Sequence, residues 1–247
     1  ISATRYLIDH GADPSKVCWR VAATGDNSRL AGGDCSTMTA GKRSTLTAGE
    51  RSGLRAGARS TLIAGRGSML QAGKDSVLKS GEDSQLKGGN NSRLTAGDHS
   101  ILSAGACSGL RAGAHSTLSA GRSSALEAGN DSALTAGTCS TLSAGGCSTL
   151  TAGNDSTLTA GGASRLTAGD FSKLTAGSYS ILTAGVYSTL TAGKGSSLTA
   201  GTGSTLVFCT ISGAVVARAV VGEDGIEPET AYILRGKDIV RAPVKIS

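Results

Sequence analysis

Polar and apolar positions repeat with a strict eight-residue period along most of the chain. Every eighth residue from Ser28 to Ser204 is serine, which gives 23 octads without an insertion or a deletion. The consensus is S-x-L-x-A-G-x-x: two positions after the serine stands leucine in 22 octads and Met38 in the other. Alanine follows in 19 octads and glycine in 22. A phase held over this length is typical of a solenoid built from stacked repeats.

Each octad has the alternation of a β-strand over its first five positions. Alternate residues of a strand face the same side, so the serine, leucine and alanine are expected inward and the two residues between them outward. The glycine is expected to supply the unusual backbone angles of a corner. Two octads can close a flattened coil of about 16 residues, and three octads in a triangular coil is the alternative. The expected fold class is therefore all-β, a flattened parallel β-solenoid.

Two adjacent octads point to a known family. Residues 148–153 and 156–161 both read S-T-L-T-A-G and resemble the repeats of bacterial ice-nucleation proteins. The resemblance covers residues 28–207 and implies a flattened β-solenoid with outward T-x-T pairs that order water. The family's T-x-T in every second octad and its tyrosine before the Gly-Ser step are absent here. Octad arrays with a C-terminal segment like residues 221–240 also resemble uncharacterised phage and bacterial proteins.

Both ends of the chain depart from the octads. An N-terminal helix is expected to end near residue 11, and Asp13-Pro14 is typical of the start of a second helix that runs to about Ala23. Valine-rich segments and turn signals near the other end predict a small β cap. The predicted domains are a helical N-terminal cap (1–27), the octad-repeat solenoid (28–207) and a C-terminal β cap (208–247).

Composition narrows the functional classes. Glycine accounts for 37 of 247 residues, aromatic residues make up only 3%, and the net charge is +6. No apolar stretch approaches the roughly 20 residues of a membrane span, and no secretory signal opens the chain. The six cysteines show no disulfide framework, so a reducing intracellular setting or a phage-associated one is favoured. No phosphate-binding loop or nucleophile elbow is present, which predicts a non-catalytic protein without a cofactor.

The favoured function is a structural or interaction scaffold that presents ladders of side chains to a protein partner or to a second copy of the chain. Phe171, Tyr179 and Tyr187 occupy three consecutive corners and are the candidate interface of a homodimer. Local shielding of the corners by these rings is the competing explanation.

The alternative function is ice binding through an outward threonine face. Regularly spaced hydroxyl and methyl groups can order water, as the family resemblance implies, whereas the ordinary β-propensity of threonine is the competing explanation. The candidate face, interrupted by Lys173, consists of Thr141, Thr157, Thr159, Thr175, Thr189, Thr191 and Thr205.

A ladder of titratable side chains at one corner is a candidate metal site. On a 16-residue coil two imidazoles on adjacent coils would be flanked by carboxylates, and such a set could ligate zinc or another divalent ion. A solvated ladder is the competing explanation, and a triangular coil would remove the alignment. The four residues are Asp83, His99, His115 and Asp131.

Residues 36–67 form a basic stripe with Glu50 as their only acidic residue. Such a stripe attracts phosphate groups. Nucleic-acid binding is nevertheless disfavoured, because no aromatic residue is interleaved to stack on bases. The basic residues are Lys42, Arg43, Arg51, Arg55, Arg59 and Arg66.

Overall fold

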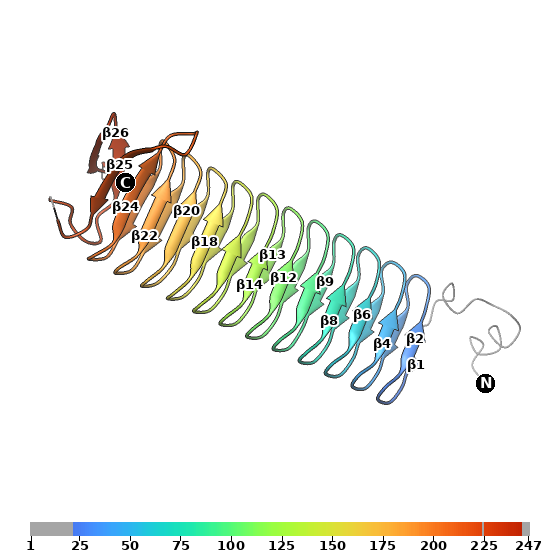
Figure 1. Cartoon of the computed structure of the whole chain (residues 1–247). Coiled ribbons are helices and arrows are strands. Elements are labelled where there is room, and N and C mark those ends of the chain that lie inside the picture. The colour runs from blue at the N-terminus through green and yellow to red at the C-terminus, as the bar shows by residue number, and fades with distance from the viewer. Residues whose placement is uncertain (1–21, 224, 244–247) are drawn as a thin grey trace, which may run out of the picture. The chain divides into compact units, whose positions relative to one another are not determined.

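The computed structural model describes residues 22–223 and 225–243, and every regular element in this part is a β-strand. The chain divides between Gly121 and Arg122 into two compact units. In both units short strands stack in parallel to form a flattened β-solenoid (Figure 1).

The first unit consists of two facing sheets of very short strands. The odd-numbered strands form one sheet in the order β1-β3-β5-β7-β9-β11-β13, and the even-numbered strands form the other in the order β2-β4-β6-β8-β10-β12. Their bounds are β1 Ala22–Ala23, β2 Arg29–Ala31, β3 Thr37–Thr39, β4 Thr45–Thr47, β5 Gly53–Arg55, β6 Thr61–Ile63, β7 Met69–Gln71, β8 Val77–Lys79, β9 Gln85–Lys87, β10 Arg93–Thr95, β11 Ile101–Ser103, β12 Gly109–Arg111 and β13 Thr117–Ser119.

The second unit repeats this arrangement and ends in antiparallel strands. Its sheets have the orders β15-β17-β19-β21-β23-β26-β27 and β14-β16-β18-β20-β22-β24-β25. The bounds are β14 Ala125–Glu127, β15 Ala133–Thr135, β16 Thr141–Ser143, β17 Thr149–Thr151, β18 Thr157–Ala160, β19 Arg165–Thr167, β20 Lys173–Ala176, β21 Ile181–Ala184, β22 Thr189–Ala192, β23 Ser197–Ala200, β24 Thr205–Cys209, β25 Val215–Val220, β26 Tyr232–Arg235 and β27 Asp238–Arg241.

The register between strands shows that each coil contains 16 residues. In the first unit Leu46 lies beside Leu62, and Leu62 lies beside Leu78. The same offset pairs Leu142 with Leu158 in the second unit. All of these leucines are buried. The two-octad coil with leucine inward is thus confirmed, and a triangular coil of three octads, which would pair residues 24 apart, does not occur in either unit.

Serine ladders satisfy the polar groups of the narrow core. The backbone N–H of Ser140 donates to Oγ of Ser156 at 3.3 Å, and that hydroxyl donates to the carbonyl of Asn154 at 3.1 Å. Both kinds of bond recur along the units, and every buried side-chain nitrogen or oxygen in the described residues has a partner. Each serine therefore links its own turn to the preceding coil and leaves no hydroxyl group of the ladder buried without a partner.

The corners differ from the prediction. A positive φ occurs at the residue before each octad serine, for example 57° at Cys107 and 56° at Phe171, and the consensus glycine does not have one. The glycine is required by close approach instead: a Cβ on Gly161 would lie 2.7 Å from the nitrogen of Gly146 in the preceding coil. The glycine therefore lacks the positive φ of a corner residue, because the constraint on this position comes from the preceding coil and not from the turn itself.

The solenoid also begins earlier than expected. Ala22–Ala23 form β1, which pairs in parallel with Met38 and Thr39 of β3. A helix that continues to Ala23 is therefore wrong at its end, because Ala22 stands eight residues before Leu30 and takes the leucine position of an additional coil. The rest of the predicted helical cap, residues 1–21, lies outside the described residues.

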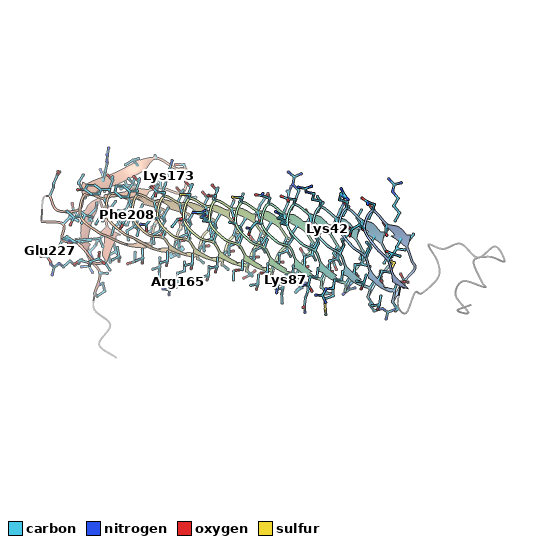
Figure 2. All side chains as sticks on the ribbon, turned by 90° about the horizontal axis from the view of Figure 1, so that it is seen from below. Lys42, Lys87, Arg165, Lys173, Phe208 and Glu227 are labelled. Atoms are coloured by element: carbon cyan, nitrogen blue, oxygen red, sulfur yellow. The ribbon has the colours of Figure 1, made fainter. Side chains whose placement is uncertain are left out.

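Antiparallel strands close the second unit, where the sequence predicts a small β cap. Strand β25 pairs antiparallel with β24, β26 pairs antiparallel with β23, and β26 and β27 form a hairpin. Phe208 replaces the octad alanine and is fully buried inside the unit (Figure 2). Because antiparallel strands occupy the place of the next coil, no further parallel coil can stack there.

Candidate functional site

The predicted threonine face is one side of the even-numbered sheet in the second unit. The first outward position of each strand forms a row in which Thr141, Thr157, Lys173, Thr189 and Thr205 lie side by side. Lys173 points away from this sheet, on the opposite side of the unit from Arg165 (Figure 2). The structure thus brings the first row of the face together and places the lysine in its middle.

The second outward position forms a parallel row beside the first. Ser143, Thr159, Thr175, Thr191 and Val207 are neighbours in that order. The face therefore consists of seven threonines in two rows, with neighbours along a row about 4.8 Å apart.

A loop borders this face near the C-terminal cap. Thr175 and Thr191 are half-buried, and they line a hollow of about 350 Å³ together with Thr210 and Ile211 of the segment that follows β24. Thr157 and Thr159, further from the cap, are exposed. The open part of the face is consequently smaller than its sequence pattern indicates.

The opposite sheet carries a second threonine row, which the sequence analysis did not name as a candidate surface. Thr135, Thr151, Thr167, Thr183 and Thr199 are consecutive neighbours without interruption. The signal was the recurrence of threonine at the second outward position from Thr135 through Thr199, which is broken only at Ser143 of the other face.

The aromatic residues lie at two different corners. The Phe171 and Tyr187 rings stack with centroids 5.6 Å apart and planes inclined by 13°, and they remain 58% and 62% exposed. Tyr179 is 70% exposed at the opposite corner, where its ring lies against Gly195. Phe171 and Tyr187, which are 16 residues apart, thus stack across adjacent coils, and Tyr179 is not part of that pair.

The predicted metal ladder is only partly assembled. The rings of His99 and His115 are exposed and stack with centroids 5.0 Å apart. Asp83 binds Arg66 at 2.7 Å, and this hydrogen bond raises the pKa of the Arg66 guanidinium. Asp131 belongs to the second unit. Among the described residues no group of three or more histidine, cysteine, aspartate or glutamate side chains has an arrangement that could hold a metal ion.

The basic stripe is divided between two corners of the first unit. Lys42, Arg43 and Arg59 lie on turns that lead from odd-numbered to even-numbered strands, whereas Arg51 and Arg66 lie on the turns of the opposite corner. Arg55 lies in β5, at the outward position before the Arg59 turn. The linear run of charge in the sequence is therefore not one surface.

Asparagine and aspartate two positions before the serine have a structural role that sequence reasoning missed. Oδ1 of Asp98 accepts the backbone N–H of Ala114 at 2.8 Å, and Oδ1 of Asn130 accepts that of Gly146 at 2.9 Å. Each bond joins equivalent positions of adjacent coils. The signal was the recurrence of these two residue types at one octad position.

The remaining chemical groups are dispersed. Cys107, Cys139 and Cys147 are exposed thiols at corner positions, and Cys209 lines an apolar hollow of about 770 Å³ in the cap with Ile211, Val216 and Leu234. The described residues include no helix long and apolar enough to cross a membrane.

Comparison with known proteins yields no relative from which a function could be transferred. No protein-family model, no curated protein and no solved structure matches this chain.

Proposed function

We propose that the chain is a non-catalytic scaffold whose outward side chains form rows for recognition by a partner. One observation supports this proposal: the bonds that join the coils use inward serines, corner asparagine and aspartate side chains and the backbone, and leave the outward positions free to vary. The position after the serine, for example, is glycine at 109, arginine at 165 and lysine at 173, all within the same register. Such independence of fold and surface is typical of repeat proteins that bind through extended faces.

The partner we propose first is a second copy of the chain, which makes contact through the Phe171–Tyr187 edge. The two rings are exposed in a unit with few aromatic residues, and aromatic side chains are enriched at protein interfaces. Stacking on one another holds both rings in a fixed orientation, which lowers the entropy that a contact must overcome.

Sedimentation velocity over a range of concentrations tests this contact. The wild type is expected to associate, and Phe171→Ser with Tyr187→Ser is expected to be monomeric. Serine suits this corner because Ser123 adopts the same positive φ. Tyr179→Ser, at the opposite corner, is the control and is expected to associate like the wild type. Monomeric wild type at high concentration would reject the proposed contact.

Ice binding is the second candidate function, and the double threonine row of the even-numbered sheet favours it. Its hydroxyl and methyl groups repeat in two directions and are fixed by the strand register. Partition of the purified protein into slowly grown ice, with the freezing temperature recorded alongside, tests this candidate. Exclusion from the ice together with freezing no warmer than buffer would reject it.

A further inference from the structure

A hollow at one corner of the first unit gathers positive charge. It measures about 340 Å³ and is lined by Asp26, Lys42, Arg43, Ala58, Arg59 and Lys74. The four cationic side chains come from three successive coils and are all exposed. At about 4.8 Å per coil they extend over roughly 10 Å along the direction of stacking.

Most of this charge is not neutralised within the protein. Lys42, Arg43 and Lys74 form no ion pair with any other residue of the described chain, and Arg59 approaches Asp75 only to 4.0 Å. Oδ1 of Asp26 already accepts the backbone N–H of Lys42 at 2.7 Å. The hollow therefore keeps a surplus of hydrogen-bond donors with positive charge.

The opposite corner of the same unit is different. Nε and Nη2 of Arg66 both bind Oδ2 of Asp83, at 2.8 and 2.7 Å, and Glu82 lies 4.0 Å from Nε. Arg51 stands beside Glu50 in the sequence of that turn. The two basic residues of that corner thus have acidic neighbours, whereas the four basic residues at the hollow keep a largely unpaired surplus of positive charge.

We propose that the hollow lined by Lys42, Arg43, Arg59 and Lys74 binds a ligand through two or more phosphate groups. Guanidinium groups bind phosphate oxygens in a bidentate manner, and lysine adds a point charge. Cations on three coils can contact phosphates that are several ångströms apart. The volume also lies within the range of sites for small ligands.

The absence of stacking groups specifies the ligand further. The sequence has no phenylalanine, tyrosine or tryptophan between residues 22 and 121. Bases bound by single-strand-binding proteins stack on aromatic rings. A ligand recognised by its phosphates alone, either a free polyphosphate or the phosphate headgroups of a lipid surface, fits this corner better than a nucleic acid does.

Calorimetric titration with inorganic tripolyphosphate tests the site with two variants matched by octad position. Lys42→Gln with Arg43→Asn removes two charges from the hollow, and Arg66→Gln with Arg51→Asn removes two from the same positions of the opposite corner. Asparagine tolerates the positive φ of Arg43 and Arg51. The first variant is expected to bind tripolyphosphate at least about tenfold more weakly than the wild type. This change corresponds to the loss of roughly one charge-assisted hydrogen bond. The affinity of the second variant for tripolyphosphate is expected to stay within about twofold of the wild-type affinity.

Further titrations distinguish the source of the phosphate. A lipid headgroup is identified if the protein binds phosphatidic acid vesicles but not tripolyphosphate, and if the Lys42→Gln, Arg43→Asn variant loses this binding. A free polyphosphate is identified if the protein binds tripolyphosphate but not the vesicles, again with loss in that variant. Equal weakening by both variants, or no binding to either probe, would overturn the proposal. Tighter binding of a thymidine oligonucleotide with matched phosphate charge would replace it with nucleic-acid recognition.

Discussion

The ring of Tyr187 occupies the space beside Gly203, its counterpart in the following coil. A Cβ on Gly203 would lie 2.5 Å from the ring, and Gly203 has a φ of 73°. Tyr179 and Gly195 form the same relationship at the opposite corner, with a distance of 2.6 Å. Both tyrosines are therefore followed, 16 residues later, by a glycine that leaves room for the ring, whereas Phe171 is followed by Tyr187, whose ring stacks on it.

Gly203→Ala is expected to lower the free energy of unfolding by about 2 kcal/mol or more, since it adds a steric clash to an unfavourable φ. Gly67→Ala is the matched control, because it has a similar φ of 67° but a Cβ there would lie 3.4 Å from the flexible Arg51 side chain. The control should lose only about 1 kcal/mol. Urea denaturation measures both changes. If Gly203→Ala lowers the free energy of unfolding equally in the wild type and in the Tyr187→Ala variant, the Tyr187 ring is not the cause of the destabilisation.

Gly161→Ala is expected to destabilise the second unit by about 1–3 kcal/mol although its φ is not left-handed. The added methyl group would approach the nitrogen and Cα of Gly146 to 2.7 and 2.9 Å, and neither backbone atom can move without shifting a coil. Gly109→Ala, where a Cβ would have no neighbour within 4 Å, should leave the thermal melting unchanged or raise it slightly. Equal effects of the two substitutions would argue against close approach of the coils.

Leu134→Asp is expected to abolish folding of the second unit, because Leu134 is 1% exposed and a buried carboxylate without a partner costs several kcal/mol. Thr135→Asp, the next residue of the same strand, points outward and should change stability by less than about 1 kcal/mol. Circular dichroism and thermal melting compare the two. A soluble Leu134→Asp protein with unchanged melting would contradict the inward assignment.

Ice binding, if present, should depend on the regularity of the even-numbered sheet. Lys173→Thr completes the row between Thr157 and Thr189 and is expected to raise thermal hysteresis, whereas Thr157→Lys with Thr189→Lys is expected to abolish it. All three positions face outward, so melting should hardly change.

A control for this experiment lies on the opposite sheet. Thr151→Lys with Thr183→Lys adds the same charge at the same two-coil separation. It should retain the activity of the wild type. Equal loss of thermal hysteresis in both double variants would show that ice binding depends on net charge and not on the even-numbered face.

Much of the fold could be predicted because a strand alternates with period two whatever surrounds it. That alternation alone placed Leu134 and the octad serines inward, and the serine ladder followed from the need to pair buried hydroxyl groups. The C-terminal β cap was predictable for a similar reason, since turn signals such as Arg235-Gly236-Lys237 act over a few residues.

The surfaces were less predictable, because they depend on which octads become neighbours. The basic stripe is continuous along the chain, yet alternate turns place Arg43 and Arg51 at opposite corners. The same alternation places Ser143 in one threonine row and leaves the row from Thr135 to Thr199 uninterrupted. Phe171 and Tyr187 meet for this reason, and Tyr179 lies apart from them.

The sequence by itself determined the inward and outward residues of each octad, since this depends only on the geometry of an extended chain. Only the tertiary structure decided between a coil of two octads and one of three, which fixes the composition of each face, and only it showed the role of the consensus glycine. An eight-residue repeat has the same inward residues in a coil of two octads or of three. Only hydrogen bonds between residues 16 apart, such as the one from the N–H of Ser140 to Oγ of Ser156, distinguish the two.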